Sequence, residues 1–325
     1  MSRSVGIATV TLNPAIDQSV AIPGFAAGRL NRVVAEHCDP GGKGVNVASF
    51  LADLRFRVAA AGLLGRDNAG VFEQLLAGKA ITDAFVRVPG KTRVNVKIID
   101  ETAPGVTEIN FPGPAATPGC LAELARMIDA LLANHDCFVL SGSVPAGVPV
   151  AFYADLIRGL KAAGKRVLLD SSGGPLRHGI AAGPWAIKPN LAELEELVGT
   201  SLLDEAAVIS AARQLLAAGV GCVVVSMGQA GALFVTGDEC LQAIPPEVEV
   251  RSTVGAGDAM VAGFVAGSLR GWTLADSARL ATASAVGALT QIGRRLPPTP
   301  VVESLMAQVL VLQVVDLASR RLLAR

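Results

Sequence analysis

A glycine-rich stretch in the last quarter of the sequence combines an anion-binding backbone with an acidic side chain. Residues 252–258 read STVGAGD, and an apolar helical pattern covers 256–269. Two glycines free the backbone to curl, so several N–H groups can face one anion at the start of the helix. Beside a bound phosphoryl group, Asp258 could take the proton of an attacking hydroxyl. The alternative is that Asp258 only complements the helix dipole.

A second glycine-rich loop, DPGGKGVN over residues 39–46, also runs straight into a helical pattern. Its glycines allow a ligand to approach the backbone closely, while Lys43 supplies a cation and Asn46 an amide. The loop is not a Walker A motif, because no glycine stands at position 37 and no Ser or Thr follows Lys43. Ligand binding and a purely structural turn both stay open for this loop.

Two further loops follow predicted strands. Residues 188–193 read KPNLAE, in which Asn190 can cap a helix and Glu193 can complete a capping box. The same two side chains could instead lie near a phosphate-bound Mg²⁺ with water between them, as hard cations prefer. Residues 226–231, SMGQAG, could wrap a nucleotide or form a tight turn.

Other catalytic and metal-binding patterns are absent from the sequence. The three histidines, at 37, 135 and 178, show no ligand spacing, and no G-x-S-x-G elbow supplies a hydrolase nucleophile. The five cysteines, at 38, 120, 137, 222 and 240, lack C-x-x-C spacing, so we expect a reducing cytoplasm and neither disulfides nor zinc. The apolar run at 5–12 is cut short by polar residues, unlike a secretion signal.

The composition sets the class of molecule. In 325 residues, 28 Lys and Arg balance 28 Asp and Glu, which argues against a nucleic-acid surface. Hydrophobic residues make up 51%, too many for disorder. No run of about 20 apolar residues predicts a membrane span. The remaining class is a globular, glycine-rich enzyme with a large hydrophobic core.

Alternating strand and helix patterns must position these loops. Strands are predicted at 5–12, 58–63, 137–140, 167–170, 185–188, 222–227 and 232–235, and helices at 44–54, 121–133, 149–163, 191–198, 206–217 and 256–269. Such alternation predicts βαβ units, a mainly parallel sheet and helices on both faces. Ligands bind at the strand ends of open α/β sheets, where glycine-rich loops meet helix starts.

Two segments break this rhythm and are predicted to be β-hairpins. The first has strands at 19–22 and 32–35, the second at 92–100 and 106–111. We expect one small lid sheet, made of 17–37 with 91–111, that excludes water from a site in an α/β core of 1–16, 38–90 and 112–325. Two ordinary surface hairpins are the alternative. Residues 297–325 show a helical pattern whose packing the sequence leaves open.

Taken together and in this order, the motifs resemble those of the ribokinase-like, or PfkB, carbohydrate kinases. The match runs from TLNPAID at 11–17 to the signature VGAGD at 254–258 and includes the loop at 41–46. TRVNVK at 92–97 and DSSG at 170–173 are similar to the versions in phosphosugar kinases of that family. The resemblance implies a ribokinase-like three-layer α/β sandwich with a mainly parallel central sheet and a small β-sheet lid.

The resemblance also implies a reaction. We expect ATP-dependent phosphorylation of fructose 1-phosphate at its C6 hydroxyl, with Mg²⁺, to give fructose 1,6-bisphosphate. A sister activity on tagatose 6-phosphate or fructose 6-phosphate is the alternative, and a catalytically silent sugar-phosphate sensor is another. A cytoplasmic homodimer paired through the lid, without nucleic-acid or membrane partners, completes the expectation.

Carried over residue by residue, the resemblance assigns roles to positions of this chain. Asp258 would be the catalytic base, and Gly255, Ala256 and Gly257 would supply the backbone amides of an anion hole. The substrate-binding residues would be Asp17, Arg29, Gly42, Lys43, Asn46, Arg93, Asn95 and Ser141, with Lys97 a further basic group nearby. The nucleotide site would be lined by Lys188, Asn190, Ser226, Gly228, Gly231 and Thr253, and Mg²⁺ would lie near Glu193 and Asn190.

One position departs from the family's pattern. Arg55 follows the helix at 44–54, where relatives usually have glycine. A helix can end without glycine, but the ending is less stable if the residue is left-handed. The departure therefore concerns stability and lies outside the chemical motifs.

Overall fold

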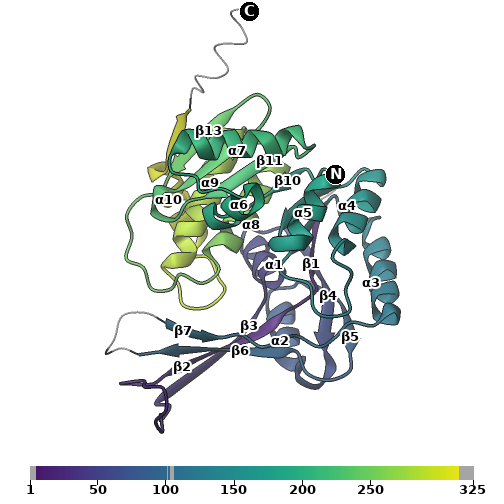
Figure 1. Ribbon diagram of the computed structural model, residues 1–325, viewed down its shortest axis with the longest axis vertical. Helices are drawn as coiled ribbons and strands as arrows, with labels where there is room; N and C mark the ends of the chain where they lie inside the picture. Colours follow the sequence, from purple (N-terminus) through teal and green to yellow (C-terminus); the bar gives the residue numbers. More distant parts are fainter. Residues whose placement is uncertain (1–4, 101, 103–105, 315–325) are drawn as a thin grey trace, which may run out of the picture.

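The computed structural model describes residues 5–100, 102 and 106–314, and this part of the chain forms two β-sheets of different size (Figure 1). The larger sheet has ten strands in the described chain, with helices on both faces. The smaller sheet has four strands and projects from one end of the α/β core. The predicted three-layer sandwich with a β-sheet lid is confirmed.

Parallel strands make up most of the larger sheet. Its order is β14-β13-β12-β11-β10-β9-β8-β1-β4-β5, and all neighbouring pairs from β11 to β5 are parallel. The pairs from β11 to β14 are antiparallel. The strands are β1 (Gly6–Thr11), β4 (Arg57–Gly65), β5 (Thr82–Val88), β8 (Cys137–Ser141), β9 (Arg166–Asp170), β10 (Ala186–Ile187), β11 (Cys222–Ser226), β12 (Ala232–Val235), β13 (Cys240–Ile244) and β14 (Leu310–Gln313).

Helices cover both faces of this sheet and enclose a hydrophobic core on each. One core contains side chains of α1 (Lys43–Asp53), α2 (Gly70–Gly78), α8 (Ala256–Leu269), α9 (Leu274–Leu289) and α10 (Thr299–Gln308). The other contains side chains of α3 (Pro118–Leu131), α4 (Phe152–Ala162), α5 (Gly173–Ala181), α6 (Leu191–Val198) and α7 (Glu205–Ala217). Successive strand residues alternate between the cores, with Ile7 in the first and Ala8 in the second. The two-sided burial explains the near-continuous apolar runs of the strands.

The four-stranded sheet is the predicted lid, and its strands come from both hairpins. It has the order β3-β2-β6-β7, from β2 (Ala15–Ala21), β3 (Ala35–Gly41), β6 (Arg93–Ile99) and β7 (Val106–Ile109). A small core of Val20, Ile22 and Ile98 lies under it. The second strand of the first hairpin, expected at 32–35, lies instead at 35–41 and leads directly into α1. Proline and glycine at its end concealed the strand, although edge position makes them tolerable there.

The C-terminal region differs in part from its helical pattern. Helix α10 ends at Gln308, and residues 310–313 then form β14, which extends the large sheet beside β13. The rest of the predicted pattern, 315–325, lies outside the described residues. Within the described ranges, no helix is long and apolar enough to cross a membrane.

Candidate active site

The site forms at the carboxyl ends of the central strands. Strand β1 lies between β4 and β8: the chain leads from β1 to β4 and β5 on one side and then returns to β8 on the other side. This reversal of strand order opens a crevice at the carboxyl ends of β1 and β8. Thr11, Ser141 and Asp170 end three adjacent strands in register. In the described part of the chain, Thr11 Oγ1, Ser141 Oγ and Asp170 Oδ2 are buried without a hydrogen-bond partner. Buried polar atoms of this kind are expected where a polar ligand binds.

The loop before α8 has the geometry of an anion site. Gly255 precedes the helix with a φ of 85°, a left-handed conformation that side-chain-bearing residues rarely adopt. Ala256, Gly257 and Asp258 form the first turn, whose N–H groups have no intrahelical partner. A Cβ at Gly257 would lie 3.5 Å from the Lys188 ammonium nitrogen, so this cation faces the loop.

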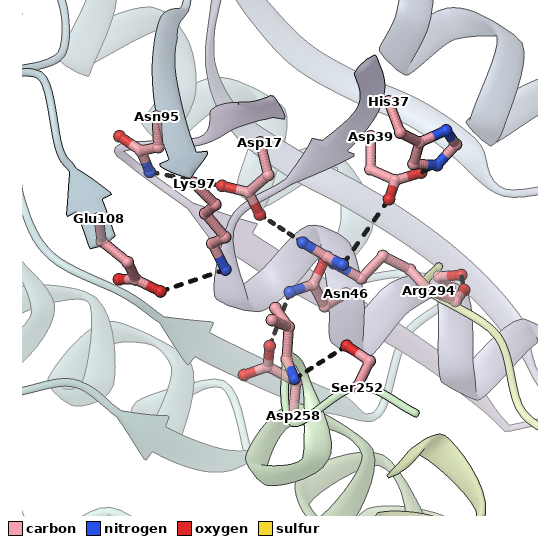
Figure 2. Close-up of polar contacts among 12 residues, drawn as sticks. Asp17, His37, Asp39, Asn46, Asn95, Lys97, Glu108, Ser252, Asp258 and Arg294 are labelled. Atoms are coloured by element: carbon pink, nitrogen blue, oxygen red, sulfur yellow. Dashed lines mark hydrogen bonds and ion pairs between the residues drawn. The ribbon is translucent and has the colours of Figure 1, made fainter. Parts of the chain in front are cut away.

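Asp258 is buried, and its carboxylate turns away from its own helix. It makes no capping hydrogen bond in α8 but accepts one from Asn46 Nδ2, 2.7 Å from its Oδ2 (Figure 2). Burial, followed by the charge of Asp170, raises the pKa of Asp258 to about 6. The Asn46 hydrogen bond and the two cations Lys43 and Lys188 oppose this rise. The carboxyl group is thus poised to accept a proton near neutral pH.

Two lysines and two carboxylates form a charged cluster beside this base. Lys43 Nζ lies 3.0 Å from Asp170 Oδ1 and 3.8 Å from Glu193 Oε1. Lys188 Nζ lies 3.7 Å from the same Asp170 oxygen. Burial acts against the charge of Lys43, but the Asp170 and Glu193 carboxylates raise its pKa above the ordinary value. Lys43 therefore remains cationic beside Asp170, and the Lys188 side chain lies next to the same carboxylate.

Asn190 and Glu193 form the capping box that the sequence predicted. Asn190 Oδ1 accepts from Glu193 N at 2.8 Å, and Glu193 Oε2 accepts from Asn190 N at 2.9 Å. Glu193 Oε1 and the partnerless Asp170 Oδ2 are oxygen ligands of the kind Mg²⁺ binds. Among the described residues no cluster of three acidic, His or Cys side chains could hold a metal alone. The donor set therefore suits a magnesium ion that keeps most of its contacts to water and nucleotide phosphates.

The loop at 226–231 connects β11 to β12, and its glycines have structural reasons. Gly228 and Gly231 have φ of 60° and 85°, and a Cβ at Gly231 would lie 2.0 Å from the Ala243 carbonyl oxygen. Ser226 pairs with Asn190 in an isolated β-bridge, which places this loop beside the capping box. The tight turn is thus observed. A role in nucleotide binding stays a prediction for Ser226, Gly228 and Gly231. It also stays a prediction for Thr253, which is exposed.

The lid brings several of the predicted sugar-binding residues to the crevice. Asp17 faces Asn95 across β2 and β6, with 3.5 Å between Asp17 Oδ1 and Asn95 Nδ2 (Figure 2). The Arg93 guanidinium donates to the carbonyl oxygens of residues 13, 14 and 111, and burial lowers its pKa. A Cβ at Gly42 would lie 2.9 Å from Pro14 Cα, so this residue must be small for the loops to pack.

Two other predicted basic residues do not join this group. Arg29 is exposed in the loop between β2 and β3, where its backbone carbonyl oxygen accepts a hydrogen bond from Asn31 Nδ2. Lys97 lies 3.5 Å from Glu108, so it pairs within the lid itself. The role of Arg29 in binding the substrate phosphate stays a prediction.

Sequence reasoning missed two residues that the fold brings into the site. Asp170 carried a usable signal, because it ends a buried strand whose neighbours also end at the crevice. Arg294 carried none, because it lies in an irregular segment after α9. Its guanidinium forms an ion pair with Asp17, and its Nε donates to Asn46 Oδ1 at 3.2 Å (Figure 2).

Comparison with known families and curated proteins gives a consistent result. Residues 3–300 match the model of the pfkB family carbohydrate kinases. The chain is 50% identical to the 1-phosphofructokinase of Rhodobacter capsulatus, over 90% of this chain and 93% of that protein. It is 39% identical to the 1-phosphofructokinase of Escherichia coli K12, over 95% and 98% of the two chains.

Solved structures show the same architecture. Phosphofructokinase-2 from Escherichia coli, in complex with substrates and products, superposes with a TM-score of 0.85 at 31% identity, over 94% of this chain and 99% of that one. A possible 1-phosphofructokinase from Thermotoga maritima gives a TM-score of 0.85 at 30% identity, over 95% and 100%. Ribokinase from the same organism, 23% identical with a TM-score of 0.76 over 93% and 99% of the two chains, shares the fold.

Proposed function

The chain belongs to the pfkB family of carbohydrate kinases, and from this premise we propose that it is an ATP-dependent 1-phosphofructokinase. It transfers the γ-phosphoryl group of ATP to the C6 hydroxyl of fructose 1-phosphate, giving fructose 1,6-bisphosphate and ADP. The observation that carries the proposal is that a buried Asp258, with its pKa raised to about 6, lies just after a loop whose Gly255 has a left-handed backbone conformation at the start of a helix. This arrangement puts a base and an anion hole side by side.

Asp258 acts as the general base. Its carboxylate takes the proton of the C6 hydroxyl as that oxygen attacks the γ-phosphorus in line. A pKa of about 6 leaves most of the carboxyl groups ionised at pH 7, while keeping them more basic than an ordinary aspartate. Asn46 holds the carboxylate in place through the 2.7 Å hydrogen bond to Oδ2.

The transferring phosphoryl group is stabilised by backbone amides and cations. The backbone N–H groups of Gly255, Ala256 and Gly257, at the start of α8, receive its negative charge. Lys188 faces the same loop, and Lys43 contacts the same Asp170 oxygen as Lys188 does. Lys43 also helps Arg93 to bind the phosphate of the phosphosugar.

The sugar phosphate is held between the lid and the strand ends. Asp17 and Asn95 hydrogen-bond its hydroxyl groups, with Gly42 and Ser141 beside them. Arg93 binds the 1-phosphate, because a guanidinium suits bidentate phosphate contacts and its described hydrogen bonds go only to uncharged carbonyl oxygens. Arg29 adds a further positive charge from the lid loop.

The nucleotide lies over the loops at 188–193 and 226–231. Ser226 and Gly228 line it beside Asn190 and Lys188, and Gly231 and Thr253 border the same space. Glu193 and Asn190 hold the nucleotide's Mg²⁺ through water, and Asp170 Oδ2 is the third oxygen in reach of this region. Bound there, the ion neutralises phosphate charge during transfer.

The relatives favour a 1-phosphate over a 6-phosphate as substrate. The curated relatives at 50% and 39% identity are 1-phosphofructokinases, whereas the phosphofructokinase-2 solved with fructose 6-phosphate is 30% identical. The 6-phosphates of fructose and tagatose are therefore the competing substrates. A silent sensor is disfavoured by the intact base, anion hole and lysine pair.

The decisive experiment compares kcat/KM for fructose 1-phosphate, fructose 6-phosphate and tagatose 6-phosphate with ATP and Mg²⁺. Fructose 1-phosphate should be preferred by about tenfold or more, since a misplaced phosphate loses its charged hydrogen bonds. Fructose 1-phosphate and fructose 6-phosphate give the same bisphosphate, so rates rather than product identity decide. Equal or faster turnover of either 6-phosphate contradicts the proposed substrate.

Two properties complete the proposal. The enzyme works in the cytoplasm, and it pairs as a homodimer through the lid. Exposed apolar side chains on the lid strands and their loops, including Val34 and Val106, support the second point.

A further inference from the structure

Arg294 lies where the lid, helix α1 and the base meet (Figure 2). Its side chain is 8% exposed. Its Nη2 pairs with Asp17 on β2, and its Nη1 lies 3.9 Å from Asp39 Oδ2 on β3. Its Nε donates to Asn46 Oδ1 on α1. One guanidinium therefore joins two lid strands to the helix that reaches Asp258.

The Asn46 amide has two different ends, and each has one partner. Its oxygen accepts from Arg294, and its Nδ2 donates to Asp258. A guanidinium has donors and no acceptor, so it can face only the oxygen end of the amide. With the oxygen held in that direction, the nitrogen end must face Asp258.

We propose that Arg294 is a positioning residue, which fixes the orientation of the Asn46 amide and so keeps a hydrogen-bond donor on Asp258. The inference rests on the proposed function, in which Asp258 is the base. Arg294 acts through Asn46 and touches no reacting atom. Because Asp17 and Asp39 hold the guanidinium, the base is linked to the position of the lid.

The surroundings of Arg294 argue against direct binding of the substrate phosphate. Two carboxylates, from Asp17 and Asp39, already offset its single positive charge. A phosphate approaching Arg294 would therefore meet two negative groups as well. Arg93 lacks such close carboxylate partners in the described residues, which makes it the better phosphate ligand.

The backbone of Arg294 is anchored independently of its side chain. Its carbonyl oxygen accepts from Ser49 Oγ at 2.5 Å and from Lys79 Nζ at 3.3 Å. Lys79 also pairs with Asp53, which accepts from the backbone N–H of Leu296 at 2.9 Å. Helices α1 and α2 thus hold this segment, so a side-chain substitution changes the guanidinium contacts with little backbone movement.

Other charged groups face the carboxyl of Asp258 and stay in place in the variants below. They are Asp170 from β9, Lys43 from α1 and Lys188 from the segment after β10. Asp39, the second carboxylate beside Arg294, has a further partner: His37 Nε2 lies 3.0 Å from Asp39 Oδ1. Histidine side chains change charge between pH 5 and 8, so His37 needs its own control.

The test is the pH dependence of kcat/KM for fructose 1-phosphate in the full chain carrying Arg294→Met. Without the guanidinium the Asn46 amide can turn its oxygen to Asp258, which removes a donor from the ionised carboxylate. The acid limb should then move upward by about one pH unit. Arg294→Gln places an amide there, which can offer Asn46 either a donor or an acceptor, so it should shift the limb in the same direction; it replaces the Met variant if that one fails to fold.

Controls separate positioning from general destabilisation. Arg295→Gln removes the neighbouring, exposed charge, and His37→Gln removes the imidazole; both should leave the acid limb in place. In an Asn46→Ala background, Arg294→Met should not move the acid limb of kcat/KM any further, because the Asn46 amide that connects Arg294 to Asp258 is absent. An unmoved limb in both Arg294 variants overturns the inference, and so does a large rise in KM without a shift.

The failure of this inference can be told from failure of the proposed function. If the wild-type chain phosphorylates none of the three phosphosugars, the proposed function fails. The inference is then read from ¹³C NMR titration of the Asp258 carboxyl carbon in the free protein, assigned with Asp258→Asn. An upward shift of the midpoint in Arg294→Met supports it, and an unchanged midpoint overturns it.

Discussion

Among single side chains, Asp258 shows how burial and neighbouring groups set the pKa of a carboxyl group that we propose as the base. Burial and Asp170 favour the neutral carboxyl, whereas Asn46, Lys43 and Lys188 favour the ionised one. The balance gives a pKa of about 6, which lies close to the operating pH expected of a general base. An aspartate that only complemented the helix dipole would be exposed, and the dipole would lower its pKa instead of raising it.

Asp258→Asn should lower kcat by about 10²–10⁴-fold, because the amide cannot accept the hydroxyl proton. Fructose 1-phosphate binding, measured by isothermal titration calorimetry, should remain detectable. Asp276→Asn is the matched control: Asp276 occupies the corresponding third position of α9, where it pairs with Thr273 and Arg279. Near-normal turnover of Asp258→Asn, or equal losses in both variants, would remove Asp258 from the role of base.

The pH dependence of kcat/KM for the wild-type enzyme should show the titration of the Asp258 carboxyl group. The base must be ionised, so kcat/KM should fall tenfold per pH unit below about pH 6 and level off above it. Steady-state rates from pH 5 to 8 at constant ionic strength measure this limb. A limb centred near pH 4 would indicate that Asp258 has the pKa of an exposed aspartate.

The same raised pKa has an effect on stability. The folded pKa of about 6 exceeds the unfolded value of about 4, so the neutral carboxyl favours folding below about pH 4 and this contribution is lost as the pH rises through 6. At pH 8, Asp258→Asn should therefore raise the free energy of unfolding by about 1–3 kcal/mol. Urea denaturation at pH 8 and pH 4 measures the difference, which should shrink at the lower pH.

The sequence pointed to those residues of the candidate site whose signal is local. Asp258, Asn46, Asn190 and Glu193 all lie in glycine or capping motifs within a few residues of a helix start. Arg294 could not be found this way, because its partners Asp17 and Asn46 lie about 250 or more positions earlier and no local pattern encodes that proximity.

At the level of elements, helix α1 ends in a motif that normally uses glycine. Phe56 N donates to Leu51 O and Arg55 N donates to Ala52 O, the two hydrogen bonds of a Schellman ending. Arg55 has a φ of 67°, so it meets the left-handed condition under which the sequence predicts a less stable helix ending. Helix α2 ends in the same way at Ala80, with a φ of 52°.

Arg55→Gly should therefore stabilise the protein by about 0.5–1 kcal/mol, since glycine removes the left-handed strain and offsets its own higher unfolded-state entropy. Urea denaturation midpoints measure the change, and kcat should stay the same. Arg55→Ala is the control, because it removes the side chain but keeps the Cβ and the strain. Equal stabilisation by alanine would attribute the effect to charge instead of backbone conformation.

Some elements escaped prediction for physical reasons. Nearly every residue of α9 after its first turn is buried, so small residues on all sides leave no amphipathic period. Strand β3 contains Pro40 and Gly41, which usually end strands, yet it lies at an edge of the lid where they are tolerated. The parallel core strands were predictable because their apolar runs report two-sided burial directly.

For the whole molecule, the lid has two exposed edges that the core does not cover. Strands β3 and β7 are the outer strands of the small sheet. Exposed apolar residues gather on and beside them: Val33, Val34, Val106, Ile109 and Phe111 are 45–68% exposed. Unpaired edges with apolar side chains favour pairing with another chain. Under the proposed function, the lid would therefore link the site, through Asp17 and Arg294, with pairing of two chains.

Light scattering coupled to size-exclusion chromatography should thus give twice the chain mass of 33.2 kDa. Val34→Lys combined with Val106→Lys should shift the protein towards the monomer, because burying a charge in an apolar interface is unfavourable. Leu203→Lys is the matched control, since Leu203 is 91% exposed but lies on the core between α6 and α7. A monomeric wild type contradicts pairing through the lid, and dissociation by Leu203→Lys alone would place the interface on the core.

If the dimer holds the lid in position, the monomeric variant should also show a higher KM for the phosphosugar, since Asp17, Arg93 and Asn95 all come from the lid.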